Sequence, residues 1–185
     1  MITTSEIYPS AVLVPFIRCY SFREFDTHGL DVVKSFHATH EMTLPFFFKA
    51  VPVKLVCPQS GKILQKGNYT GITGISTQYN GEMTFNGNYA FFAIIFKPAG
   101  FNKIFGFSPL EIADQIIDTD GVIGVSVKNL YEQLIEAGSL EKMACLVNEF
   151  LLSHLNRQKP AKYKNEITLL IKKYTTLCTV YLKIL

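Results

Sequence analysis

The chain has no tryptophan, few cysteines and few charged residues. What is scarce or missing in the sequence narrows the kinds of site and the compartment that the protein can have. The cysteines, Cys19, Cys57, Cys145 and Cys178, are far apart and form no Cys-x-x-Cys pair, which excludes the usual spacing of a structural zinc site. Apolar neighbours indicate reduced, mostly buried thiols, as expected for a cytoplasmic protein. The longest strictly apolar run, Tyr89–Phe96, has eight residues, whereas a membrane-spanning helix needs about 20. We therefore expect a soluble protein with no membrane partner.

Common catalytic signatures are also missing from the sequence. It contains no Gly-x-Ser-x-Gly, no phosphate-binding P-loop and no Gly-x-Gly-x-x-Gly. Asp118 and Asp120 flank Thr119 beside a turn, so a structural role is expected for both. The sequence therefore predicts that the chain is not an enzyme and needs no cofactor.

The net charge of +3 is too small to indicate nucleic-acid binding, which normally requires a concentrated basic face. Residues 157–164, "RQKPAKYK", hold basic residues and no acid. This stretch could touch phosphates without sequence preference. A solvated linker is the interpretation that we favour.

Aromatic residues are abundant, with 15 Phe and 9 Tyr among 185 residues, and they gather in short segments typical of strands. Strands are predicted at Leu44–Phe48, Val51–Cys57, Tyr69–Ser76, Glu82–Phe85 and Tyr89–Phe96. Asn80-Gly81 and Asn86-Gly87 separate the last three of these segments, and Asn-Gly favours two-residue hairpins. The pattern predicts a meander of three antiparallel strands. Glycines recurring within Tyr69–Ser76 indicate bulges or close approach of another backbone.

Helical signals dominate the second half. Ser108-Pro109-Leu110-Glu111 forms a capping box with proline at the first helical position. Helices are predicted over Lys128–Ala137, ended by Gly138, and from Ser139 to Leu155, where apolar residues recur at spacings of three and four. The fold prediction is α+β, with an N-terminal antiparallel β barrel or sandwich followed by a helical section. The patterns divide the chain into a strand-rich part at 1–107, a helical section at 108–156, and a part at 157–185 that starts with a basic linker.

A ligand pocket inside the barrel is the site that the sequence predicts best. Barrel interiors lined by aromatic side chains and a few polar groups are common small-molecule sites. The candidate residues are His40, Tyr69, Tyr79, Tyr89 and Phe91. The alternative for each aromatic residue is that it simply fills the core.

Histidines offer a weaker metal hypothesis. His37, His40 and Glu41 lie close together in "FHATHEM", and imidazole suits zinc, iron or nickel. On a strand, however, residues three apart point to opposite faces, so ordinary polar histidines are the preferred interpretation. His154, near the predicted end of a helix, is expected to be favourable there when protonated.

The segment "FKPAGFNKIFGFSPLEIAD" resembles the end of the N-terminal sensor domain in one branch of the AraC-type transcriptional regulators. The matching positions are Phe96, Lys97, Pro98, Gly100, Phe101, Phe105, Glu111 and Asp114. "YPSAVLVPFIRCYSF" is similar to that family's opening, and residues 129–155 are similar to its paired helices. The resemblance implies a cupin-like barrel at 1–107 that senses an unknown small-molecule effector, and helices at 108–156 that dimerise or relay the signal. It also implies a C-terminal pair of helix-turn-helix units, of which 157–185 would hold the basic linker and a remnant.

The chain departs from this pattern after residue 155, where only 30 residues remain. Base readout needs a helix placed in the major groove, so DNA binding is expected only through a helix-turn-helix region that this chain lacks. A shortened chain, the product of a disrupted gene and a stand-alone sensor all fit the sequence. The leading hypothesis is the ligand-sensing, homodimeric portion of a bacterial AraC-type regulator. The alternative is a stand-alone cupin-like binding protein or metalloenzyme.

Overall fold

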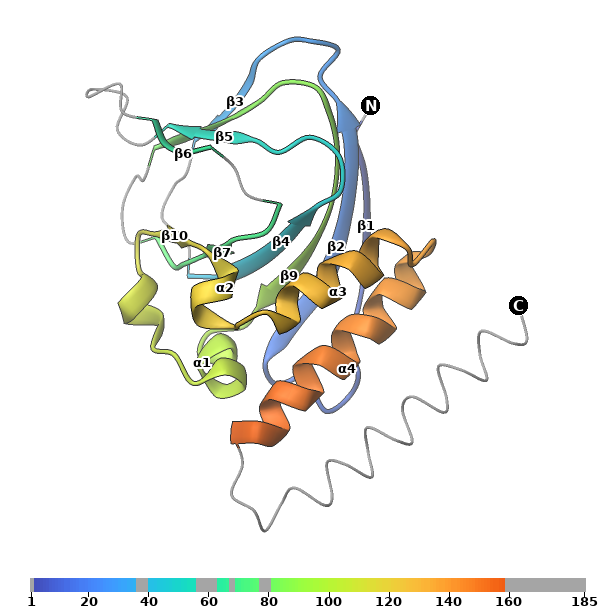
Figure 1. Cartoon of the computed structure of the whole chain (residues 1–185), viewed down its shortest axis with the longest axis vertical. Helices are drawn as coiled ribbons and strands as arrows, with labels where there is room; N and C mark the ends of the chain where they lie inside the picture. Colours follow the sequence, from blue (N-terminus) through green and yellow to red (C-terminus); the bar gives the residue numbers. More distant parts are fainter. Residues whose placement is uncertain (1, 36–39, 56–62, 67–68, 77–80, 159–185) are drawn as a thin grey trace.

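The computed structural model describes residues 2–35, 40–55, 63–66, 69–76 and 81–158. The fold is α+β, with the strands of the described residues in two antiparallel sheets (Figure 1). Sheet A has the order β1-β2-β9-β4-β7-β10, and its strands are β1 (Thr3–Ile7), β2 (Ile17–Asp26), β9 (Asn88–Phe96), β4 (Met42–Phe47), β7 (Ile72–Thr73) and β10 (Ile116–Ile117). Sheet B has the order β3-β8-β5-β6, and its strands are β3 (Val32–Ser35), β8 (Glu82–Phe85), β5 (Val53–Leu55) and β6 (Ile63–Lys66). Closure of these sheets into a barrel stays a prediction.

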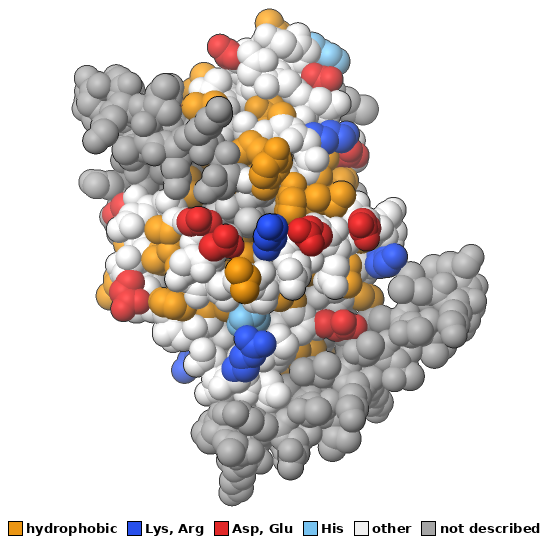
Figure 2. All heavy atoms as spheres, in the orientation of Figure 1, with side chains coloured by type: hydrophobic (Ala, Val, Ile, Leu, Met, Phe, Trp, Pro, Cys, Tyr) orange, Lys and Arg blue, Asp and Glu red, His pale blue; other side chains and the backbone are white. Residues whose placement is uncertain are grey.

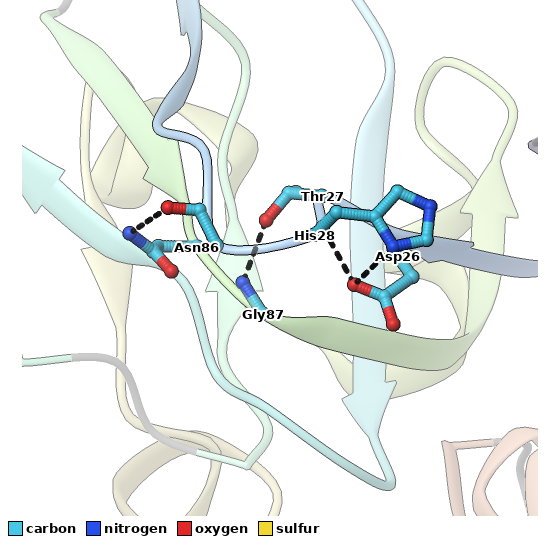
Figure 3. A network of polar contacts seen from close by, with 6 residues as sticks. Asp26, Thr27, His28, Asn86 and Gly87 are labelled. Atoms are coloured by element: carbon cyan, nitrogen blue, oxygen red, sulfur yellow. Dashed lines mark hydrogen bonds and ion pairs between the residues drawn. The ribbon is translucent and has the colours of Figure 1, made fainter.

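Neighbouring strands of sheet A continue as neighbouring strands of sheet B. β2 pairs with β9, and their continuations β3 and β8 pair with each other. Backbone and side chain of Thr27 hold the corner together: its amide donates to the Gly87 carbonyl at 3.0 Å, and the Gly87 amide donates to its hydroxyl at 2.8 Å (Figure 3). The Asp26 carboxylate also accepts from the His28 amide at 2.7 Å. The two sheets are therefore joined by a hydrogen-bonded bend.

This bend corrects the predicted meander. Asn86-Gly87 does not close a hairpin, because β8 lies in sheet B and β9 in sheet A. Gly87 has a φ of 124°, so the special backbone conformation is present, but it serves a crossing between sheets. The other Asn-Gly pair includes Asn80, which lies outside the described residues.

The predicted strand Tyr69–Ser76 is also shorter than expected, since only Ile72–Thr73 forms β7. Gly74 explains part of the interruption: a Cβ there would overlap the carbonyl oxygen of Ile112. The prediction of close backbone approach is confirmed at Gly74, whereas a Cβ at Gly71 would make only ordinary contacts. β1, β2 and β3 were not predicted from the sequence.

Helices cover one face of sheet A. They are α1 (Gly100–Phe105), the 3-10 helix η1 (Pro109–Ile112), α2 (Thr119–Val122), α3 (Ser126–Ile135) and α4 (Leu140–Gln158). The two long helices agree with the predictions to within a few residues. Ser108 forms the predicted capping box with Glu111, although it caps the short η1. The predicted cap at Ser139 is present too, since its hydroxyl accepts from the Lys142 amide.

The alternation of β2, β9 and β4 gives sheet A two different faces. The helix face packs against α1, α3 and α4 in a single apolar core. Its central residues are Tyr20, Leu44, Phe46, Phe92, Ile94 and Phe96, which are all completely buried. The opposite face, which we call the interior face, consists of Cys19, Ser21, Arg23 and Phe25 on β2, Tyr89, Phe91, Ala93 and Ile95 on β9, and Thr43, Pro45 and Phe47 on β4.

The junction after β9 seats α1 on the core. β9 ends at Phe96, immediately before Lys97-Pro98, as proline's missing amide predicts. The left-handed turn falls on Ala99, with a φ of 61°, whereas Gly100 is needed because a Cβ there would overlap the backbone of Phe16. Phe101 and Phe105 then pack their rings against Phe96.

No helix in the described parts of the chain combines the length and apolar character needed to cross a membrane. On the side of the molecule drawn in Figure 2, coloured basic and acidic side chains are interspersed. That side shows no concentrated basic patch among the described residues.

Candidate ligand-binding face between the sheets

Aromatic side chains occupy one end of the interior face, next to the bend. Phe85 of sheet B packs against Phe25 and Tyr89 of sheet A, with ring centroids 5.5 and 5.1 Å away. Phe47 and Phe91 lie beside this group, with their rings 5.1 Å apart. Since these residues join both sheets in one apolar cluster, the interior face is the face of sheet A that sheet B covers at this end.

Small and polar side chains occupy the rest of the interior face. Ser21 lies opposite Ala93, which lies opposite Pro45. Ser21 is 1% exposed, yet its hydroxyl has no hydrogen-bond partner among the described residues. A buried polar atom without a partner carries a desolvation cost of about 1–3 kcal/mol. A structural role alone gives no reason for this cost.

Arg23 stands between the aromatic and the small residues. It lies two residues after Ser21 on β2, so both side chains point to the same face, and it lies opposite Phe91 on β9. Its Nε atom is buried and lacks a hydrogen-bond partner within the described part of the chain. The interior face thus carries a partly buried cation whose donors are not fully used, opposite Phe91.

Charged groups surround the other end of β2, near Cys19. Arg18 pairs with Glu41 at 3.1 Å. Burial raises the pKa of the Cys19 thiol, with Glu6 as the next contributor. The thiol therefore stays protonated at neutral pH, which argues against a nucleophilic role because the thiolate is the reactive form.

Two of the predicted site residues, Tyr89 and Phe91, lie together on the interior face. Tyr89 is only 2% exposed, and its hydroxyl accepts from the Asn86 amide at 2.9 Å and donates to the Asn86 carbonyl. The Tyr89 hydroxyl is thus already bonded to the backbone of Asn86 in the bend. Phe91 is less buried and stands next to Arg23, so it is the better placed of the two to touch a ligand.

The other predicted site residues are not gathered there. His40 is exposed. Tyr69 is 58% exposed and packs its ring 5.7 Å from Tyr131 on α3, so it contacts the helical side of the molecule. Tyr79 lies outside the described residues.

The metal hypothesis has little to support it in the described structure. His37 lies outside the described residues, and Glu41 is engaged with Arg18. Within residues 2–35, 40–55, 63–66, 69–76 and 81–158, no cluster of three or more His, Cys, Asp and Glu side chains could hold a metal ion.

His154 differs from the prediction that it would be favourable in its charged form. It is 9% exposed and packs against Phe105 and Phe150. Burial, aided by the nearby Arg157 charge, lowers its pKa from 6.5 to about 4. The imidazole is therefore neutral at pH 7, because the apolar surroundings outweigh the helix dipole.

Two hydrogen bonds link the helices to the strands that form the interior face. The Tyr131 hydroxyl on α3 donates to the Phe47 carbonyl at 2.9 Å, and burial raises the pKa of Tyr131, which keeps this donor protonated. The Tyr20 hydroxyl on β2 donates to the Asn148 side chain on α4 at 2.8 Å. Phe47 thus contacts Phe91 through its ring and α3 through its backbone.

Sequence reasoning missed Ser21 and Arg23 because β2 was not recognised as a strand. The signal was present in "IRCYSFREF", where Tyr20 and Phe22 alternate with Cys19, Ser21 and Arg23. That period-two pattern marks a strand with one apolar and one polar face.

Comparisons with known proteins give a family but no activity. A search of the curated proteins found no significant match. Among solved structures, a Salmonella typhimurium protein described as a candidate ethanolamine utilization protein Q aligns over 52% of this chain and 70% of its own, at 7% identity and a TM-score of 0.35. That score is too low to establish a common fold. A family profile matches residues 5–118, which span both sheets and the junction. The chain therefore belongs to the family described as a domain of unknown function, DUF6597.

Proposed function

We propose that this chain is the small-molecule-sensing portion of an AraC-type transcription regulator, with the effector bound against the interior face of sheet A. The observation that carries the binding part is the pair of buried polar atoms, Ser21 Oγ and Arg23 Nε, which have no hydrogen-bond partner among the described residues. Arg23 lies opposite Phe91, whose ring contacts Phe47. A few polar groups converging among aromatic side chains are typical of small-ligand sites. A bound effector would supply the missing hydrogen-bond partners.

The regulator part of the proposal rests on the resemblance of residues 96–114 to the AraC-type junction. The geometry of that segment supports a role in transmission. α1 is held between the end of β9 and α4, through Phe101 and Phe105 against Phe96 and through Phe105 against Phe150. A shift of β9 would therefore displace α1 and, through the contact of Phe105 with Phe150, α4.

Transmission would occur by a population shift between two arrangements of sheet and helices. An effector touching the Phe47 ring would favour one position of the Phe47 backbone, and hence one position of Tyr131 and α3. Only differential affinity for the two arrangements can produce such a shift. In a chain carrying a helix-turn-helix region, the position of the helices would then alter DNA affinity.

Dimerisation also remains part of the proposal, but the surface must differ from the one expected. The apolar stripe of α4 is used within the chain, since Val147 and Leu151 are completely buried and Met143 and Leu155 nearly so. A dimer would have to use another surface. Light scattering at high protein concentration tests this, and a strictly monomeric chain would contradict it.

Ligand sensing is tested by a thermal-shift screen of the purified chain against metabolites of all charge types. We expect at least one compound to raise Tm in a concentration-dependent way, since a ligand that binds only the native state stabilises it by mass action. Tyr131→Phe should retain the affinity for that compound but lose the ligand-induced change in hydrogen exchange on α3. Failure of every compound, whatever its charge, would reject the sensing function.

A further inference from the structure

Arg23 and Ser21 together indicate what kind of small molecule the interior face would hold. Ser21 is almost completely buried, and its hydroxyl is unpartnered among the described residues. Arg23 follows it by two residues on the same face of β2, with a buried and unpartnered Nε. Residues two apart on a strand lie about 7 Å from each other, so one small ligand can reach both.

The charge of Arg23 is not neutralised by the acidic residues near it. Glu24 pairs with Lys49 at 3.0 Å, and Glu41 pairs with Arg18 at 3.1 Å. Glu6 lies opposite Ser21 on the exposed edge strand β1, and it forms no ion pair with Arg23. In the described structure, the guanidinium has no carboxylate within ion-pair distance. A partly buried cation without a counter-ion favours an anionic ligand.

We propose that the interior face binds a small monocarboxylate with a flat apolar body, held at its carboxylate by Arg23 and Ser21. The guanidinium fork matches the two oxygens of a carboxylate, and the Ser21 hydroxyl donates a further hydrogen bond. The apolar body lies toward Phe91 and Phe47, whose rings favour offset or edge contacts with another ring. This assignment rests on the proposed sensing function and narrows it to one ligand class.

A carboxylate fits better than a phosphate because the interior face offers few donors. A phosphate group carries more charge and more acceptor oxygens, and it is usually met by several cations or by backbone amides at a helix N-terminus. On β2 this face supplies one guanidinium and one hydroxyl, and the backbone amides of β2 and β9 are paired with each other. One negative charge is what this set can match.

The test uses acid and amide pairs that differ only in charge, measured on the full chain by isothermal titration and thermal shift. The probes are benzoate with benzamide, phenylacetate with phenylacetamide and hexanoate with hexanamide, with inorganic phosphate as a further anion. We expect at least one aromatic acid to bind at millimolar concentration or tighter, at least about tenfold more tightly than its amide, which corresponds to about 1.4 kcal/mol. Phosphate should not compete.

Variants connect binding to Arg23. Arg23→Gln should weaken binding of the acid about tenfold or more, because it removes a charge-assisted pair. Arg23→Lys should have an intermediate affinity, since it keeps the charge but loses the fork. Arg18→Gln is the matched control, because it removes the same charge from the same strand at a site already paired with Glu41, and it should leave binding unchanged.

Each outcome separates this assignment from the broader sensing function. Equal binding of acids and amides, stronger binding of phosphate, or full binding by a folded Arg23→Gln would overturn the carboxylate assignment while leaving a sensor in place. If no acid binds but the metabolite screen finds a neutral or cationic ligand, the assignment is again wrong and sensing stands. Failure of both screens removes the two together.

Discussion

The two faces of sheet A are built from the same strands but differ in how their buried polar atoms are satisfied. On the helix face, the Tyr20 hydroxyl is buried together with its partner Asn148, and Tyr20 belongs to the large apolar core. On the interior face, Ser21 and Arg23 have buried polar atoms without partners. Native proteins satisfy nearly all buried polar groups, so the unpartnered atoms of Ser21 and Arg23, two residues apart on one face, call for a reason other than stability. The helix face forms the main apolar core with the helices, and the interior face holds the proposed binding site.

The largest expected difference between the faces concerns two neighbouring residues of β9. Phe92 is completely buried on the helix face, whereas Phe91 is only partly buried on the interior face. Phe92→Ala should lower the free energy of unfolding by about 3–5 kcal/mol, the range for a buried phenylalanine. Phe91→Ala should cost about half as much or less. Urea denaturation of both variants measures this, and equal losses would break the comparison.

The junction provides the next largest effect, because it seats α1 on the helix side. Gly100→Ala should destabilise the chain by about 1–3 kcal/mol, since the new methyl group would collide with the Phe16 backbone and force a shift. Gly121→Ala in α2 is the matched control, because a Cβ there meets nothing within 4 Å. It should be neutral or slightly stabilising. A Gly100→Ala variant as stable as Gly121→Ala would contradict the packing described for α1.

The helix side should also respond to acid through His154. The pKa of this imidazole is about 4 in the folded chain and 6.5 in the unfolded one, so between these values only the unfolded state binds the proton. Stability should therefore be fully present above about pH 6.5 and should fall by the order of 1–3 kcal/mol as the pH drops toward 4.

Variants at two histidines check the origin of this acid response. In His154→Phe, the stability loss between pH 6.5 and 4 should be smaller. His28→Asn is the control: the His28 side chain is 79% exposed, and its replacement should leave the slope unchanged. If His154→Phe lost as much stability between pH 6.5 and 4 as the unchanged chain, the acid sensitivity would come from another group.

The smallest change in stability is expected for Arg23→Gln, and its sign tells whether this arginine stabilises the fold. Without a ligand, Arg23→Gln should leave stability unchanged or raise it by up to about 1 kcal/mol, because it removes a partly buried charge with unused donors. Asn148→Ala on the other side should instead destabilise, since it removes the side-chain oxygen that accepts from the buried Tyr20 hydroxyl. Thermal unfolding measures both. A clear loss of stability in Arg23→Gln would show that this arginine is structural.

The sequence predicted the elements whose signals are local. The capping box at Ser108, the stop at Pro98 and the helices over residues 126–135 and 140–158 depend on neighbours in the chain, and all three are present. Gly100 is different, because the need for a glycine there depends on the backbone of Phe16, which is distant in sequence.

Long-range pairing was the part that the sequence could not supply. Asn86-Gly87 has the composition of a hairpin turn, but β8 and β9 do not pair with each other. β8 pairs with β3 and β5, and β9 pairs with β2 and β4. The site shows the same limit. Tyr89 and Phe91 could be named from the aromatic pattern, but the unpartnered atoms of Ser21 and Arg23 become visible only when the sheets are assembled.

The central claim is that a ligand binds on the interior face and leaves the helix face untouched, and methyl NMR tests it most directly. Ala93 and Ile94 are adjacent on β9 and point to opposite faces. When the compound from the screen is titrated in, the Ala93 methyl signal should shift strongly and the Ile94 methyl signals should move little. Shifts at Ile94 and the apolar residues of α3 and α4, with Ala93 unchanged, would contradict the account.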